Sequence, residues 1–248
     1  MTSPEPVVTR FVTASGIEVP AVTTDEMREL DRIAKEETGP TLFQMMENAG
    51  RTLALLAIEV LGGDWQTAKI VVLAGRGGNG GGGICAARHL ANRRAKVVLV
   101  QSDPDHLGDA PAVQRKIFGE TRGREVPAAH VAEERADLVL DALIGYGLRD
   151  APRGTAVDLI RWANGTGAPI LALDVPSGVD STTGATPGDA IRPRWTMTLA
   201  LPKTGLLWAG TGELFLADIG IPEGAYRRVA RTYTPPFGDR YRVRLERR

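Results

Sequence analysis

The sequence predicts an α/β fold in which helices cover a mainly parallel sheet. One observation is that strand-like runs, such as residues 70–74 and 96–100, are almost continuously apolar. Strands covered on both faces have this pattern, whereas strands with one wet face alternate. A second observation is that helical stretches separate these runs after residue 63. Repeated strand-then-helix order gives parallel strands joined by right-handed crossovers.

Composition limits both the architecture and the partners. A chain of 248 residues suits one α/β domain, and 43% hydrophobic with 24% charged residues is enough for an ordinary core. Thirty basic residues balance thirty acidic ones. A net charge of zero gives no global reason for binding nucleic acid or an anionic membrane, so we expect neither as a partner.

The cysteine content and the apolar runs indicate a cytoplasmic location. Cys85 is the one cysteine, so a disulfide within the chain is impossible, as is usual in a reducing compartment. We interpret it as a small buried helix residue without a redox role. No run approaches the roughly 18 apolar residues that span a bilayer. The first ten residues also lack the apolar centre of a signal peptide.

Two helices are predicted before the alternating region. Residues 1–22 contain three prolines and no clear period, so we expect an N-terminal arm. Thr23 and Glu26 have the spacing of a capping box, and apolar residues then recur at helical intervals up to Gly39. A second helix is expected from Thr41 to Leu61. The apolar stripes of both helices are interpreted as core or dimer contacts.

The remaining elements follow from apolar runs and turn signals. The expected order is a strand at 70–74, a helix at 84–93, a strand at 96–100, a short helix at 112–118, a strand at 138–140, a helix at 156–163, and strands at 169–173, 195–201 and 213–217. From Tyr233 onward, two prolines and several arginines favour a solvated extension over a binding arm.

Four segments that follow predicted strands carry the candidate chemistry, because ligands of open parallel sheets bind at the carboxyl ends of the strands. They are residues 75–83, 141–149, 174–180 and 202–205. In the first, Gly75, Gly77 and Gly80 satisfy G-x-G-x-x-G, a pattern that lets backbone N–H groups reach a pyrophosphate. The alternative to a pyrophosphate site is a flexible glycine turn. Asp103 lies roughly where a dehydrogenase has the acidic residue that binds the ribose of its cofactor, which keeps a dehydrogenase open as well.

Two aspartates at strand ends are candidates for acid–base work. Asp141 precedes two spaced glycines, and Asp174 precedes a tight turn fixed by Pro176 and Gly178, which would hold Ser177 in place. Either aspartate alone could be a simple cap or loop carboxylate. Adjacent parallel strands would bring the two close together.

Six segments together resemble the NAD(P)H-hydrate epimerase family, also called the YjeF N-terminal family. They are Met46 to Gly50, Gly75 to Leu90, Asp141 to Gly147, Leu173 to Gly178, Pro202 to Lys203, and Ala217 to Pro222. The resemblance covers residues 23–222. It divides the chain into an N-terminal arm (1–22), a Rossmann-like domain (23–222) and a C-terminal extension (223–248).

This resemblance implies a fold and an activity. The fold would be a Rossmann-like three-layer sandwich with two N-terminal helices, usually forming a homodimer. The reaction would interconvert the R and S forms of hydrated NADH or NADPH, a small dinucleotide substrate. A dehydratase acts on the S form, and because this chain stops soon after Pro222 it would be a separate protein.

The resemblance also implies roles for individual residues. Asp174 would be the acid–base group, with Lys203 as its partner. A potassium ion would be held by Asn79, Asp141 and Ser177, whose oxygen ligands suit a hard cation. The implied substrate contacts are Gly78, Asn79, Gly80, Gly81, Gly82, Gly145, Tyr146, Gly147, Leu148, Arg149 and Asp174.

The glycine segment departs from the family pattern at three positions. The family usually has proline, asparagine and aspartate where this chain has Arg76, Gly78 and Gly82. The missing aspartate removes a carboxylate from the substrate-facing loop. Two alternatives therefore stay open beside the epimerase, namely a divergent enzyme on another small molecule and a non-catalytic dimeric scaffold. A plain dehydrogenase is a weaker third.

Overall fold

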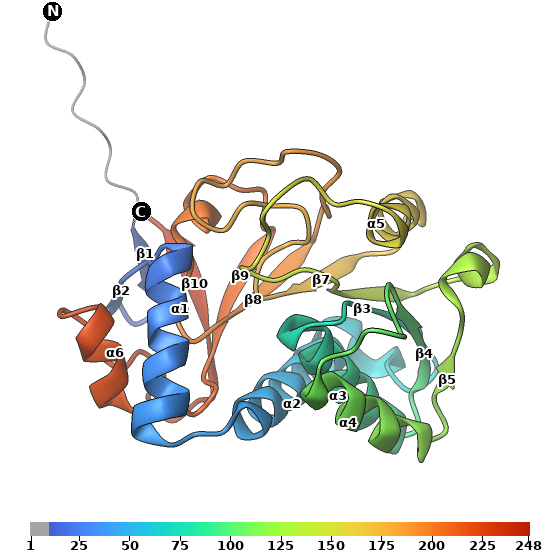
Figure 1. Ribbon diagram of the computed structural model, residues 1–248, viewed down its shortest axis with the longest axis horizontal. Helices are drawn as coiled ribbons and strands as arrows, with labels where there is room; N and C mark the ends of the chain where they lie inside the picture. Colours follow the sequence, from blue (N-terminus) through green and yellow to red (C-terminus); the bar gives the residue numbers. More distant parts are fainter. Residues whose placement is uncertain (1–9) are drawn as a thin grey trace, which may run out of the picture.

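A single ten-stranded sheet organises the computed structural model, which describes residues 10–248 (Figure 1). The strands are β1 (Phe11–Thr13), β2 (Glu18–Val19), β3 (Lys69–Ala74), β4 (Lys96–Gln101), β5 (Arg124–Glu125), β6 (Leu138–Ala142), β7 (Ile170–Leu173), β8 (Trp195–Leu199), β9 (Glu213–Ala217) and β10 (Arg242–Arg247). Their order is β2-β1-β10-β9-β8-β7-β6-β3-β4-β5. All pairs from β9 to β5 are parallel, whereas β10, β1 and β2 pair antiparallel.

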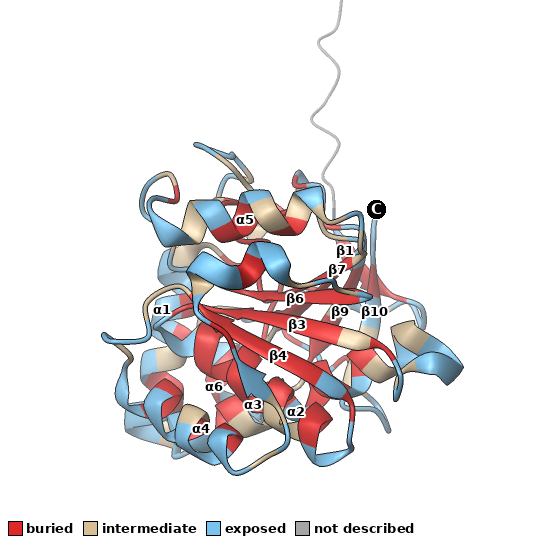
Figure 2. Ribbon diagram, turned by 90° about the vertical axis from the view of Figure 1, so that its right-hand side faces the viewer, coloured by how far each residue is buried: buried red, intermediate tan, exposed pale blue. Residues whose placement is uncertain are grey.

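Helices cover both faces of the parallel part, so the predicted three-layer α/β fold is confirmed (Figure 2). The helices are α1 (Thr24–Ile33), α2 (Leu42–Leu61), α3 (Gly78–Asn92), α4 (Asp109–Gly119), α5 (Thr155–Gly165) and α6 (Glu223–Val229), with short helical turns at Ala34–Thr38, Gly62–Asp64, Ala128–Glu133 and Thr204–Leu207. Ile70 and Val72 of β3 pack with α2 and α3, whereas Val71 and Leu73 pack with α5. Both faces of this strand are dry, which explains its continuous apolar run.

Capping residues set the starts of the two N-terminal helices. Thr23 and Glu26 form the predicted capping box at α1. Thr41 and Gln44 form an equivalent box at α2, which matches the expected boundary. Each box satisfies backbone N–H groups that a helix start leaves without partners. None of the helices within residues 10–248 has both the length and the apolar character needed to cross a bilayer.

Both ends of the described chain join the sheet, which differs from the expected arm and solvated extension. β1 pairs with β10, and β10 lies beside β9. The arm also touches the central region, because the Val22 N–H donates to the Pro202 carbonyl oxygen at 2.9 Å. Residues 1–9 of the expected arm lie outside the described part. The tail after Tyr233 ends in β10, with Leu245 buried.

Candidate active site

The strand order reverses beside β3, and this reversal creates the site. From β3 the chain moves to β4 and β5 on one side, then returns to β6 on the other. In open α/β sheets, ligands bind in the crevice outside the carboxyl ends of the strands at such a switch point. Here the segments after β3 and β6 meet closely, since the Gly75 N–H donates to the Ala142 carbonyl oxygen at 3.0 Å.

A cavity of about 970 Å³ opens at this edge of the sheet. Its lining residues are Met27, Arg28, Asp31, Lys35, Leu42, Met45, Met46, Ala49, Gly75, Arg76, Gly77, Gly78, Asn79, Gly82, Ser102, Asp103, His106, Leu143, Ile144, Gly145, Tyr146, Gly147, Arg149, Arg153, Thr155, Ala156, Leu173, Asp174, Leu199, Lys203 and Ile219. The volume suits a ligand of cofactor size. Helix α1 contributes to the wall, a role that its sequence did not reveal.

Most of the glycine run is helical rather than a loop. Helix α3 begins at Gly78, several residues earlier than the expected start at residue 84. A Cβ on Gly80 would lie 1.7 Å from the Gly75 carbonyl oxygen, and one on Gly83 would lie 2.4 Å from Ala142 Cβ. The glycines therefore let α3 approach the sheet more closely than a side chain would permit, and its N-terminus faces the cavity.

Asp174 follows β7 in a strained conformation. Its φ of 69° is in the left-handed region, which is uncommon for a residue with a side chain. The buried carboxylate accepts a bond from the Lys203 ammonium group through Oδ1, while Oδ2 accepts the Tyr146 N–H at 3.1 Å. Strain of this kind persists only where the surroundings fix it, and it clusters at functional sites.

Lys203 is completely buried, yet its ammonium group is well satisfied. Besides Asp174 it donates to the Leu199 carbonyl oxygen at 2.9 Å and to Thr198 Oγ1 at 3.4 Å. The ammonium also lies 5.8 Å from the centre of the Tyr146 ring. A buried charge is tolerated only when it is paired and hydrogen-bonded, as here.

Asp141 and Ser177 bind each other beneath the cavity. The Ser177 hydroxyl donates to Asp141 Oδ1 at 2.6 Å, and the Ser177 N–H donates to Oδ2 at 2.9 Å. Ser177 Oγ also accepts the Ile144 N–H at 2.8 Å. Burial raises the pKa of Asp141 to about 6, although these hydrogen bonds oppose the shift. The pair thus ties the segment after β7 to the segment after β6.

The side-chain amide of Asn79, in the cavity lining, has no hydrogen-bond partner among the described residues. Both its amide nitrogen and its amide oxygen are buried without a hydrogen-bond partner. A Cβ on Gly145 would lie 3.2 Å from Asn79 Cγ and 3.1 Å from Asp174 Oδ2, so both side chains converge on Gly145. Buried polar groups normally have partners, so an orphaned amide beside a cavity is available to bind a ligand.

Comparison with known proteins identifies the chain. A family model of the YjeF-related protein N-terminus matches residues 42–205. The chain belongs to this family. Among relatives of this YjeF-type domain, an NAD(P)H-hydrate epimerase of Dehalogenimonas lykanthroporepellens is 49% identical over 237 residues, covering 95% of this chain and 97% of the relative. The recognition made from the sequence motifs is thereby confirmed.

Two further comparisons extend the YjeF relationship. The bifunctional NAD(P)H-hydrate repair enzyme Nnr of Salinibacter ruber is 39% identical, and the match covers 85% of this chain but only 42% of that protein. The crystal structure of the yeast protein ynu0 covers 92% of this chain with a TM-score of 0.80. At 20% sequence identity, the yeast structure supports the shared fold alone.

The YjeF domain places most of the predicted site residues on one cavity. Those that line it are Gly78, Asn79, Gly82, Gly145, Tyr146, Gly147, Arg149, Asp174 and Lys203. Gly80 and Gly81 instead pack inside the domain, with a Cβ on Gly81 lying 2.5 Å from Met46 Cε. Leu148, Asp141 and Ser177 are also outside the lining set. Motif analysis missed Asp31, whose helical spacing gave no functional signal.

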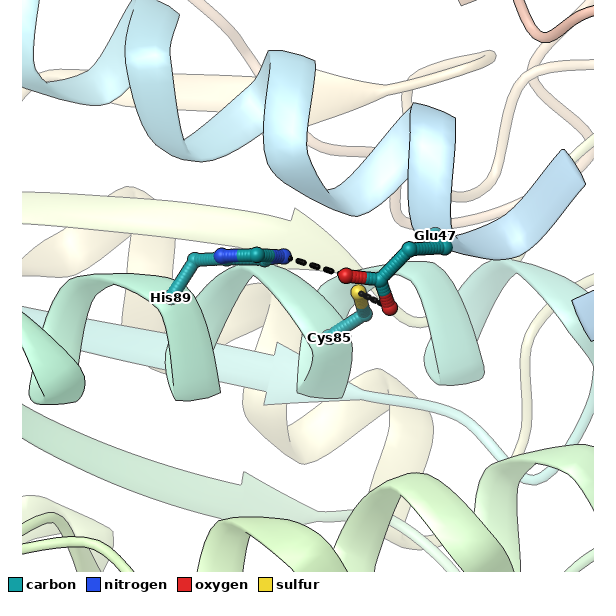
Figure 3. Close-up of side chains that lie close together, drawn as sticks. All are labelled: Glu47, Cys85 and His89. Atoms are coloured by element: carbon teal, nitrogen blue, oxygen red, sulfur yellow. Dashed lines mark hydrogen bonds and ion pairs between the residues drawn. The ribbon is translucent and has the colours of Figure 1, made fainter. Parts of the chain in front are cut away.

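A second polar cluster joins α2 to α3 outside the cavity (Figure 3). Glu47 Oε1 lies 2.7 Å from His89 Nε2, and its Oε2 accepts the Cys85 thiol at 3.3 Å. Carboxylate, thiol and imidazole groups are all possible metal ligands. However, Arg88 Nη2 already lies 2.5 Å from Glu47 Oε2 and 3.4 Å from both Cys85 Sγ and His89 Nε2. A guanidinium therefore already provides the cluster with a positive charge.

Proposed function

We propose that this chain is an NAD(P)H-hydrate epimerase, which interconverts the R and S forms of hydrated NADH and NADPH. The observation that carries the proposal is the buried Asp174–Lys203 pair in the wall of a cofactor-sized cavity. The match along nearly the whole length of a relative named for this activity supports it.

Asp174 is the acid–base group in this proposal. Inversion requires the C–O bond at the hydroxyl-bearing ring carbon to break and to form again on the opposite face. The hydroxyl leaves with a proton from the Asp174–Lys203 pair and becomes water, while the lone pair of the ring nitrogen stabilises the cationic ring. Water then adds to the other face and gives up a proton to the Asp174–Lys203 pair, which returns the pair to its starting state. The Tyr146 N–H and Lys203 hold the carboxylate in one orientation throughout.

The charges around the cavity favour a phosphate-bearing substrate. Besides the paired Lys203, five cationic side chains line it, namely Arg28, Lys35, Arg76, Arg149 and Arg153. The N-terminus of α3 adds backbone N–H groups and the positive end of a helix dipole. Position 82 exposes only backbone to the cavity, so this chain would hold its substrate without the aspartate that relatives usually carry there.

A potassium ion is part of the same proposal. The test of fit is Asn79, whose buried amide oxygen has no partner and offers the kind of ligand that hard cations prefer. Asp141 and Ser177 supply further oxygen atoms, and the hydrogen-bond partners of Asp141 are uncharged. Bound there, the ion would supply positive charge beside the substrate and would order the segment around Gly145.

The proposal extends to the partners and the location of the chain. A homodimer through the N-terminal helices is supported by the exposed apolar side chains Leu42 and Phe43 at the start of α2. A cytoplasmic location is supported by the free thiol of Cys85. A dehydratase partner would consume the S form.

A coupled assay tests the activity. Purified protein is added to the R form of hydrated NADH with excess S-specific dehydratase and ATP in potassium buffer, and NADH recovery is followed optically. We expect recovery far above the spontaneous rate for wild type, and loss of that acceleration in Asp174→Asn. Asp158→Asn, an exposed carboxylate change on α5, serves as the control. Wild-type rates from a folded Asp174→Asn protein would contradict the role of Asp174.

A further inference from the structure

Helix α1 contacts the candidate acid–base loop through Asp31. The Tyr146 hydroxyl donates to Asp31 Oδ2 at 2.5 Å, and both residues line the cavity. The contact joins segments more than a hundred residues apart in sequence. Helix α1 also lies before residue 42, where the match to the family model begins. Its contribution to the site is therefore visible only in three dimensions.

Tyr146 connects Asp31 to both members of the buried pair. Its backbone N–H donates to Asp174 Oδ2 at 3.1 Å. Its ring lies 5.8 Å from the Lys203 ammonium nitrogen. Any movement of Tyr146 would therefore change the orientation of the Asp174 carboxylate and the surroundings of Lys203.

A second contact from α1 reaches the same residue. The Ser181 hydroxyl donates to the Tyr146 carbonyl oxygen at 3.0 Å, and Ser181 Oγ lies 2.5 Å from Thr24 Oγ1 at the start of α1. Helix α1 thus restrains Tyr146 at its side chain and at its backbone.

The neighbours of Tyr146 explain why such anchors are needed. Gly145 and Gly147 flank it, and glycine backbones have many accessible conformations. A carboxylate that moves a proton must stay in place to a fraction of an ångström, because misplacement by about 1 Å can cost roughly 100-fold in rate. Without Asp31, the side chain of Tyr146 would lose its anchor, and the Ser181 contact would be left to hold the glycine-flanked backbone that donates to Asp174.

We propose that Asp31 is a positioning residue, which fixes Tyr146 by its hydroxyl and thereby fixes the Asp174 carboxylate for proton transfer. The inference rests on the proposed epimerase function and deepens it by adding α1 to the catalytic apparatus. Asp31 acts here as a hydrogen-bond acceptor. The other charged groups that face it are Lys203, Lys35 and Asp174.

Steady-state kinetics in the coupled assay test this role. Tyr146→Phe and Asp31→Ala should each lower kcat about 10- to 100-fold with KM changed less than about threefold, because the lost interaction positions the proton donor rather than the substrate. The double variant should be no slower than the slower single variant. Asp31→Asn, which keeps an acceptor oxygen, should recover most of kcat. Asp25→Asn, an exposed change on α1, should leave both constants unchanged.

Two kinetic outcomes would overturn the proposal. Multiplicative losses in the double variant would mean that Asp31 and Tyr146 act independently. An Asp31→Asn variant as slow as Asp31→Ala would mean that the negative charge matters rather than the hydrogen bond.

Hydrogen exchange separates this inference from the activity itself. Peptides covering residues 143–149 should exchange faster in Tyr146→Phe and Asp31→Ala than in wild type or Asp25→Asn. Unchanged exchange in both variants would overturn the positioning role even if the wild type is an active epimerase. An inactive wild type whose exchange responds as expected would overturn the proposed function and still support the anchoring of Tyr146 by Asp31.

Discussion

Lys203 and Asp174 form an ion pair from which water is almost wholly excluded. Their side chains are 0% and 5% exposed, respectively. Each charge depends on the other, because a lone buried charge costs several kcal/mol in proteins. The pair lies on the segments that follow β7 and β8, so two neighbouring strands hold the chemistry together.

Removing one charge of this pair should destabilise the fold more than removing both. We expect Lys203→Met to lower the free energy of unfolding by about 3–5 kcal/mol, because the Asp174 carboxylate stays buried without its cation. The double variant with Asp174→Asn should recover much of that loss while remaining inactive. Urea unfolding at pH 7 measures both. A double variant as unstable as the sum of the single variants would contradict this coupling.

Neighbouring glycines of α3 should differ in their tolerance of alanine. A Cβ on Gly83 would lie 2.4 Å from Ala142 Cβ in the sheet, so Gly83→Ala should cost about 1–3 kcal/mol by overpacking. A Cβ on Gly82 would meet only the rotatable Leu173 Cδ2 at 2.9 Å. Gly82→Ala should therefore cost less, because the Leu173 side chain can rotate away whereas Ala142 Cβ cannot, and the helix-propensity gain of about 1 kcal/mol is common to both variants. Thermal unfolding of the two variants measures the difference. Equal losses of stability in Gly82→Ala and Gly83→Ala would contradict the prediction.

Arg76 should act in substrate binding rather than in the chemical step. Its Nη1 pairs with Asp103 at 3.6 Å, but the side chain is 68% exposed at the cavity, so its other N–H groups are accessible to a phosphate. Arg76→Ala should raise KM severalfold with kcat nearly unchanged, because uniform binding is lost. Arg122→Ala, an exposed arginine away from the cavity, is the matched control. A fall in kcat at constant KM would place Arg76 in the chemical step instead.

The Glu47 cluster should contribute to acid stability. Burial alone would raise the pKa of Glu47, but hydrogen bonds from Arg88, Cys85 and His89 outweigh it and lower the pKa to about 2. A depressed carboxyl pKa stabilises the fold above pH 4.5, and this contribution is lost as pH falls toward 2. The stability gap between wild type and Glu47→Gln should therefore be widest above pH 4.5 and shrink toward pH 2. Urea unfolding at pH 7, 4 and 3 measures it, and a constant gap would contradict the shift.

Local patterns predicted the parts of the fold that depend on local chemistry. The capping box joins Thr23 to Glu26, three residues away, and the apolar run of β3 reflects burial on both faces. Both features can be read from a short stretch of sequence. Strand β10 was missed although Val243 and Leu245 alternate with arginines at strand period. The nearby prolines and the many charges favoured a solvated tail, and pairing with β1 and β9 overrode that preference.

The candidate site was predictable only where residues follow strands of the parallel core. Asp174 and Asn79 reach the cavity because sheet topology brings strand ends together. Asp31 had no such signal, since it lies within a helix and not after a strand. The segment 75–83 was interpreted as a loop because its seven glycines are poor helix formers, yet close packing of α3 requires Gly80 and Gly83.

The pairing of β1 with β10 has a consequence for biosynthesis. β10 lies between β1 and β9 and pairs with both. β1 can therefore join the rest of the sheet only after β10 has been synthesised. During translation the edge of β9 stays open, and an open edge can pair with another nascent chain. Early termination or clipping within β10 would therefore separate β1 and β2 from the sheet together, and aggregation would be the expected phenotype of such nonsense alleles.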